Sequence, residues 1–147
     1  MSLKALISLF AAAFITGCAI TPDYDSDKSV QLRSEHIPAN LSYVFVINDF
    51  PVSAPYRTAS VDGGDRILIG SMMFYRFDLS PGEHIFSIAS TVNTERLTVD
   101  ALPGQAKYIK IGYEFSWDGG HGDVAIVLDV LTEAEGKSIL QTTQAVE

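Results

Sequence analysis

The chain has 147 residues, with 10 Lys or Arg and 18 Asp or Glu, a formal net charge of −8. An acidic surface repels nucleic acid and anionic lipid headgroups, so we expect neither as a partner. The length allows one domain with a hydrophobic core and is too short for two of ordinary size.

The first 17 residues have the build of a secretory signal peptide. A short charged region is followed by an apolar run over residues 5–15 and then by the small residues Thr16 and Gly17. The run is about half of the roughly 20 apolar residues that a membrane-spanning helix needs. We therefore expect residues 1–17 to be removed from the mature protein.

The tetrapeptide Ile15-Thr16-Gly17-Cys18 resembles the lipobox of bacterial lipoproteins. The resemblance implies cleavage between Gly17 and Cys18, and attachment of a diacylglyceryl group and an acyl chain such as palmitate to Cys18. The alternative is an ordinary signal peptide with a chance cysteine, although ordinary sites more often show an A-x-A pattern. Cys18 is the only cysteine of the chain, and lipidation removes the liability of an unpaired thiol in an oxidising compartment.

The same resemblance predicts a location. Two or three acyl chains hold a protein on a membrane essentially permanently, because one myristoyl-sized chain already binds with K of order 10⁴ M⁻¹. Asp after the lipidated cysteine implies retention in the inner membrane in enteric-type sorting, and Ala19 stands here instead. The resemblance therefore implies the outer membrane, with the domain in the periplasm. Without residues 1–17, nine basic and 18 acidic side chains remain, a formal net charge of −9.

Residues 18–40 read as a lipidated N-terminus and flexible tether, because the stretch 21–29 is polar with little to bury. Part of this segment could instead pack along the domain, since Val30, Leu32 and Ile37 are apolar. We expect the folded domain to cover residues 41–147.

From residue 41 onward the pattern predicts strand after strand. Residues 43–47 are apolar at both parities, which indicates a strand covered on both faces. Residues 48–57 contain Pro51 and Pro55 and read as a loop. The stretches 58–61 and 66–69 flank Asp62-Gly63-Gly64-Asp65, whose residue types favour the positive φ angles of a tight hairpin turn.

Further strands with one buried and one wet face are expected where apolar and polar residues alternate, over 73–79, 85–89, 96–101, 108–115 and 124–130. Two Pro-Gly sequences, 80–83 and 102–105, predict type II turns between them. Residues 117–122 read as a flexible loop. Thr132 and Glu135 could form a capping box that opens a short C-terminal helix, although Gly136 weakens that expectation.

Seven to eight short strands separated by turns predict an all-β fold, an antiparallel β-sandwich or a small barrel, with a possible short C-terminal helix. No long helical pattern exists that could connect parallel strands, which argues against an α/β fold.

Four motifs between Tyr43 and Tyr108 resemble those of the small bacterial lipoproteins grouped as DUF2846-like. They are Val61-Asp62-Gly63, Phe74-Tyr75, Pro81-Gly82-Glu83-His84 and Lys107-Tyr108. The Asp-Gly and Pro-Gly-x-His skeleton is also similar to PEGA-type surface domains. The resemblance implies envelope anchoring and a sandwich-like fold, and implies no reaction. The chain departs from the family outline at Gln105-Ala106, which replaces part of a tight G-K-Y-Y element.

No motif of a nucleophilic or zinc enzyme occurs in the sequence. His84 opens a strand after a Pro-Gly turn, where hydrogen bonding to turn carbonyls is the expected role. The loop carrying Asp118, His121 and Asp123 is the best candidate for a cation site, with a polar hairpin loop as the simpler interpretation. We expect no cofactor beyond the lipid on Cys18.

Two loops could recognise a partner. One carries Phe50 and Tyr56 and the other Trp117, and aromatic residues on loops are favoured binding residues. The alternative is that these rings fold back over the open ends of the sandwich.

The leading hypothesis is thus a non-enzymatic lipoprotein that binds an envelope protein or peptidoglycan. The alternatives are an accessory lipoprotein of a secretion or transport complex, and an envelope hydrolase with a carboxylate pair drawn from Asp62, Asp65, Glu114 and Asp118.

Overall fold

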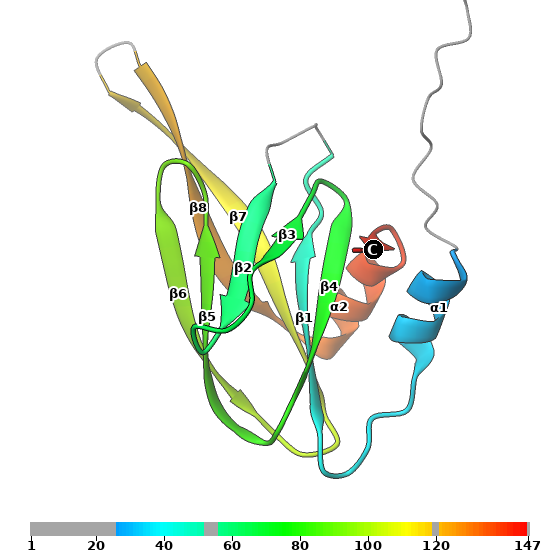
Figure 1. Ribbon diagram of the computed structural model, residues 1–147. Coiled ribbons are helices and arrows are strands. Elements are labelled where there is room, and N and C mark those ends of the chain that lie inside the picture. Colours follow the sequence, from blue (N-terminus) through cyan, green and yellow to red (C-terminus); the bar gives the residue numbers. More distant parts are fainter. Residues whose placement is uncertain (1–25, 52–55, 119–120, 147) are drawn as a thin grey trace, which may run out of the picture.

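The computed structural model describes residues 26–51, 56–118 and 121–146, with the side chains of Asp118 and His121 excepted (Figure 1). The signal peptide, Gly17 and Cys18 lie outside the described residues. The elements in chain order are α1 (Asp27–Ser34), β1 (Ser42–Asn48), β2 (Arg57–Val61), β3 (Ile67–Ile69), β4 (Met73–Leu79), β5 (Gly82–Ala89), β6 (Thr94–Ala101), β7 (Ala106–Asp118), β8 (His121–Leu131), α2 (Glu133–Leu140) and β9 (Gln144–Ala145).

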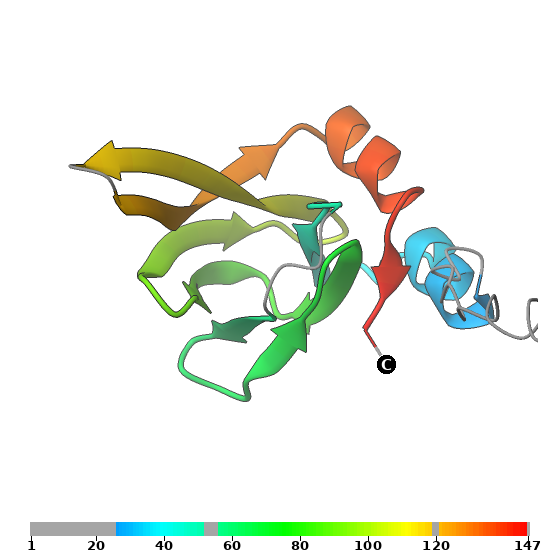
Figure 2. The same ribbon diagram turned by 90° about the horizontal axis from the view of Figure 1, so that it is seen from above.

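Two sheets pack face to face, so the predicted sandwich is confirmed and the small barrel is not formed. The larger sheet has the strand order β8-β7-β1-β4-β9 and the smaller one β3-β2-β5-β6. The smaller sheet is antiparallel throughout. The larger sheet is mixed, because β1 pairs in parallel with β7, and β4 with β9. Figure 2 shows both helices on the side of the larger sheet that faces away from the smaller one.

Strand β1 lies at the centre of the larger sheet, and all seven of its residues are buried. Val44 and Val46 belong to the core between the two sheets, whereas Tyr43, Phe45 and Ile47 belong to a second core beneath the helices. This explains why residues 43–47 are apolar at odd and even positions alike, and it confirms the prediction of a strand covered on both faces.

Helix α1 covers part of the segment that the sequence predicted as a tether. Ser29 accepts a hydrogen bond from the Ala145 amide at its Oγ (2.9 Å), and Arg33 donates from Nη2 to the Thr143 carbonyl (2.6 Å). Leu32 packs on the outer core, as does Ile37, while Val30 is exposed. The alternative of packing along the domain therefore holds for Leu32 and Ile37 and is wrong for Val30.

Helix α2 begins with the predicted capping box. Thr132 accepts from the Glu135 amide, and the Glu135 carboxylate accepts from the Thr132 amide (3.0 Å). Both helices in the described part of the chain have eight residues, too few to cross a membrane.

Candidate functional site

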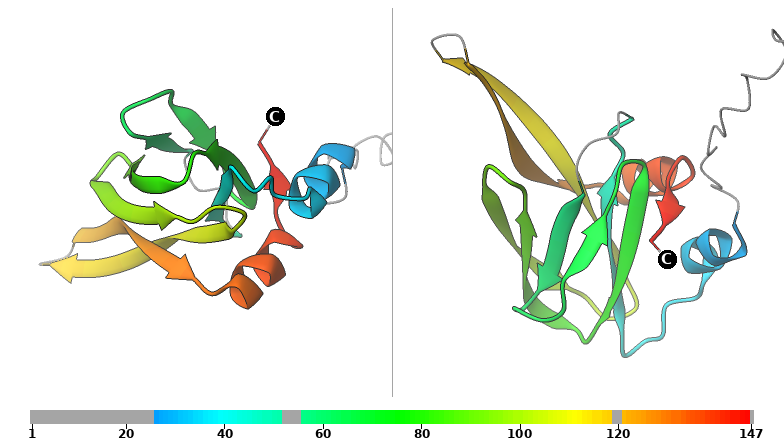
Figure 3. Two further views of the ribbon diagram at one scale, coloured as in Figure 1. Left: turned by 90° about the horizontal axis from the view of Figure 1, so that it is seen from below. Right: turned by 45° about the horizontal axis from the view of Figure 1, so that its top comes forward.

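Strands β7 and β8 form a two-stranded projection that reaches beyond the rest of the sandwich (Figures 1 and 3). The ladder runs from the pair Tyr108–Leu131 to the pair Asp118–His121. The prediction of a loop over 117–122 is therefore wrong in extent, since Trp117 pairs with Gly122 within the strands. We call residues 113–118 and 121–126 the arm.

One face of the arm is apolar and exposed. Tyr113, Phe115 and Trp117 alternate along β7 and share this face with Val124, which lies opposite Phe115. Phe115 is 66% exposed and Trp117 is 80% exposed. The alternating pattern predicted one buried face over 108–115, and this is wrong for Phe115.

The smaller sheet ends before the arm does. Asn93, in the loop between β5 and β6, meets Ile126 of β8, with its Oδ1 accepting from the amide and its Nδ2 donating to the carbonyl (3.0 Å each). Residues of the arm beyond this point have no opposing strand in the described part of the smaller sheet, so their apolar face stays exposed.

A cavity of about 300 Å³ lies at the base of the arm, lined by Phe50, Arg57, Ser90, Thr91, Val92, Tyr113, Phe115 and Val124. The Tyr113 side chain is fixed here from three sides. Its ring centroid lies 4.6 Å from that of Phe50 and 5.2 Å from the Arg57 guanidinium, and its hydroxyl donates to Asn48 Oδ1 (3.0 Å). The base of the arm is thus held in place by side chains from β1, β2 and the loop after β1.

The three aromatic residues named as partner-binding candidates do not gather in one place. Phe50 folds back onto Tyr113, as the alternative interpretation expected, whereas Trp117 points its ring into solvent. Tyr56 is 64% exposed and its ring lies beside Gly70, away from the cavity lining. Sequence reasoning missed Phe115 as a binding candidate because its spacing is that of a core residue.

The opposite face of the arm is polar and acidic. Glu114 and Asp123 are exposed there, and the sequence contains no Lys or Arg between Lys110 and Lys137. Lys110 is itself paired with Asp49, with 2.9 Å between Nζ and Oδ2. The arm therefore combines an aromatic face with an unneutralised negative charge.

His84 joins two turns at the other end of the sandwich. Its Nδ1 lies 2.6 Å from Asp62 Oδ2 and its Nε2 lies 2.8 Å from the Ser80 carbonyl. The hydrogen bond to Asp62 and that to Ser80 raise the pKa of His84, and the pKa of Asp62 is lowered by the bond to His84 and by the Ile85 amide. Two acceptors on one ring suit the imidazolium, which donates from both nitrogens. The expected bonding to a turn carbonyl is confirmed.

This contact also brings two family-like motifs together. Asp62 and Gly63 both have positive φ angles, and the Gly64 amide donates to the Val61 carbonyl (2.8 Å), as a tight hairpin turn requires. His84 then ties this turn to the turn that precedes β5. The motifs Val61-Asp62-Gly63 and Pro81-Gly82-Glu83-His84 thus form one structural unit.

The metal and hydrolase hypotheses gain no site from the described residues. Asp123 is exposed, while the side chains of Asp118 and His121 lie outside the description; elsewhere in the described chain no three His, Cys, Asp or Glu residues gather. The Asp62 carboxylate, in the turn that follows β2, is bonded to His84 and to the Ile85 amide, whereas Glu114 lies on the arm. The loop carrying Asp118, His121 and Asp123 stays a prediction as a cation site.

Compared with known protein families, the chain matches no family model, and no curated protein matches it. The resemblance to DUF2846-like lipoproteins stays a prediction based on its motifs.

Proposed function

We propose that the protein is a lipid-anchored, non-enzymatic binding module on the periplasmic face of the outer membrane, and that its arm binds another envelope protein. The observation that carries this proposal is the apolar face of the arm, where Phe115 and Trp117 are exposed on a two-stranded element.

Large exposed aromatic rings are a recognised mark of interaction sites. Tryptophan and tyrosine are enriched among the residues that dominate binding energy, and they lose little conformational entropy when bound. Tyr113 at the base of the arm is already held in one position, so this part of the surface loses little conformational entropy when a partner binds.

The charge of the arm restricts the kind of partner that can bind it. Three acidic residues of the arm, Glu114, Asp118 and Asp123, follow Lys110 along these two strands with no Lys or Arg between them. Complementary charge steers association and excludes wrong partners. The preferred partner therefore presents apolar side chains flanked by Lys or Arg.

Anchoring at Cys18 supports such a module. A lipid-anchored domain meets other envelope proteins at a high effective concentration, so a modest binding face is sufficient. An accessory subunit of a secretion or transport complex would use the same face, with a larger assembly as its partner.

In-cell crosslinking of the native lipoprotein, with mass spectrometry of the products, tests the proposal. We expect a discrete protein partner that is lost in Trp117→Ala and in Cys18→Ala. Val130→Ser serves as the matched control, because Val130 is also an exposed apolar residue of β8 (55% exposed) but lies near the other end of the ladder.

The stability of the Trp117→Ala variant shows whether the Trp117 ring serves partner binding or packing of the fold. Because the ring is 80% exposed, we expect the free energy of unfolding to change by no more than about 0.5 kcal/mol. A partner retained by Trp117→Ala contradicts the proposal, and products that contain only peptidoglycan assign the arm to glycan instead. A large loss of stability assigns the ring to packing. Absence of lipid on the mature N-terminal peptide refutes the anchor.

A further inference from the structure

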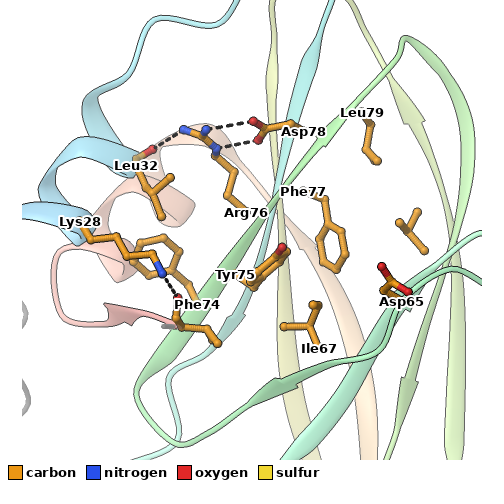
Figure 4. A pocket seen from close by; sticks show the side chains of 12 residues that line it. Lys28, Leu32, Asp65, Ile67, Phe74, Tyr75, Arg76, Phe77, Asp78 and Leu79 are labelled. Atoms are coloured by element: carbon orange, nitrogen blue, oxygen red, sulfur yellow. Dashed lines mark hydrogen bonds and ion pairs between the residues drawn. The ribbon is translucent and has the colours of Figure 1, made fainter.

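A second surface lies on the other side of the sandwich, along the free edge of β4 (Figure 4). A groove of about 610 Å³ follows this edge, with residues 74–79 of β4 as its floor. Lys28 and Leu32 of α1 form one wall, and Val61, Asp65 and Ile67 of the β2–β3 hairpin form the other. The groove is therefore a slot between a helix and a hairpin with a strand edge at its base.

The edge of β4 is only partly paired. Strand β9 pairs with Met73 and Phe74, and the ladder ends where the Val146 amide donates to the Phe74 carbonyl (2.9 Å). The Val146 carbonyl then accepts from Lys28 Nζ (2.7 Å) instead of continuing along β4. Within the described chain, no strand pairs with this edge past Phe74.

The main-chain groups that face the groove follow from the pairing. Successive residues of a strand direct their N–H and C=O groups to opposite sides. Because the Phe74 carbonyl bonds to Val146, Arg76 and Asp78 share its direction and present their main-chain groups to the groove. Tyr75, Phe77 and Leu79 use theirs toward β1.

The side chains of the groove favour an apolar occupant. Tyr75, Phe77 and Leu79 face the smaller sheet, where the partly buried Val61 and Ile67 complete an apolar wall.

The positive charge of Arg76, on the floor of the groove, is already paired with carboxylates. Arg76 donates to Asp78 and Glu35 (2.7 Å each) and stacks over Tyr43, with its guanidinium 4.0 Å from the ring centroid. Because this guanidinium has its own carboxylates, the groove offers main-chain hydrogen bonds and apolar contact rather than a free charge.

We propose that this groove accepts an extended segment of another polypeptide, which lies beside β4 as a strand and continues the ladder that β9 begins. Strand addition takes its affinity from main-chain hydrogen bonds and its specificity from alternate side chains. Every second side chain of the guest, which is apolar, packs against Tyr75, Phe77 and Ile67. A second copy of this chain is disfavoured by the formal net charge of −9 expected for the mature chain.

A pair of substitutions at one position isolates the strand edge. Asp78→Pro removes an N–H that faces the groove and that β1 does not use, and proline is tolerated at such edge positions. Asp78→Ala removes the same carboxylate but keeps the N–H. Any effect of the lost Asp78–Arg76 ion pair is therefore common to both variants.

The probe is a phage-displayed library of random decapeptides, selected against the full mature chain in detergent micelles. We expect enriched peptides with alternating apolar residues, and slowed hydrogen exchange of the Arg76 and Asp78 amides when a synthetic copy binds. Affinity should fall about tenfold or more in Asp78→Pro and less than about threefold in Asp78→Ala, because loss of a main-chain hydrogen bond costs on this order.

Four results overturn the proposal. The first three are the absence of any enriched peptide, equal affinity of the two Asp78 variants, and protection of amides elsewhere without protection on β4. A doubled mass in light scattering that Asp78→Pro returns to the monomer value also overturns it, by assigning the edge to a second copy. The arm is not involved in these readouts, so Trp117→Ala should leave them unchanged.

Discussion

Gly136 of α2 provides a prediction in which two effects of opposite sign compete. In an exposed helix interior, Gly→Ala stabilises by about 0.8–1.0 kcal/mol. Here, a Cβ added to Gly136 would lie 2.1 Å from Cγ and 2.6 Å from Cβ of Tyr108. Atoms so close must move apart by more than 1 Å, and Tyr108 is buried and stacked on Phe45 with 5.3 Å between ring centroids.

The clash should outweigh the helix propensity. Overpacking a well-packed core costs about 1–3 kcal/mol, and contacts this short place the cost at the upper end. We expect Gly136→Ala to lower the free energy of unfolding by about 2 kcal/mol after the gain in propensity is subtracted.

Urea denaturation of the mature chain measures this loss. Ala134→Gly, at an exposed position in the first turn of the same helix, gives the effect of propensity without a clash and should cost no more than about 1 kcal/mol. A Gly136→Ala variant as stable as the wild type, or more stable, would refute the reasoning that close helix–sheet contact requires glycine here.

Two further predictions concern polar contacts between elements. The pKa of His84 is raised, so its bond to Asp62 stabilises the fold fully below the ordinary imidazole pKa, about 6.5, and this stabilisation is lost as the pH rises through the pKa of His84 in the folded protein. The pKa of Asp62 is lowered, so the stabilisation from its carboxylate is lost at the acid end, as the pH falls through the pKa of Asp62 in the folded protein. Wild-type protein should thus be less resistant to urea at pH 8.5 than at pH 5.5, and His84→Gln should remove the part of this difference that the pair supplies; an unchanged pH profile would contradict the role of the pair. Asn93→Ala should cost about 1–3 kcal/mol, because it leaves both main-chain groups of Ile126 without the side chain that bonds them. Faster hydrogen exchange of the Ile126 amide would accompany that loss, and an unaltered unfolding midpoint would exclude it.

Local patterns predicted much of the fold. The apolar run over residues 43–47 indicated a strand buried on both faces, and the Asp62-Gly63 turn and the Thr132–Glu135 capping box formed as expected. Each of these depends on residues close together in sequence, so the physical rule that governs it can be applied without knowing the tertiary structure.

Pairings between distant strands could not be obtained in this way. Nothing in the residues of β1 and β7 distinguishes a parallel from an antiparallel neighbour, and the two-residue β9 has no strand pattern of its own. Phe115 has the spacing of a core residue. It is exposed because β7 and β8 extend beyond the Asn93–Ile126 contact, where the smaller sheet ends.

The candidate surfaces were predictable to different degrees. Trp117 was identified from its residue type and its glycine-rich neighbourhood, and it is exposed on the arm. The groove along β4 could not have been found, because its walls come from α1 and from the β2–β3 hairpin, which only the tertiary fold brings to the same edge.

The parallel pairing of β1 with β7 has a consequence for the order of folding. Ser42 of β1 bonds to Gln105, 63 positions later, so the central strand of the larger sheet is completed only after most of the chain is available. Closing such a long loop costs entropy before any contact rewards it, which makes folding slow. For the exported lipoprotein that we propose, this delay is useful: the polypeptide stays unfolded while it threads through a translocation channel, and its sandwich closes only when the second half has arrived.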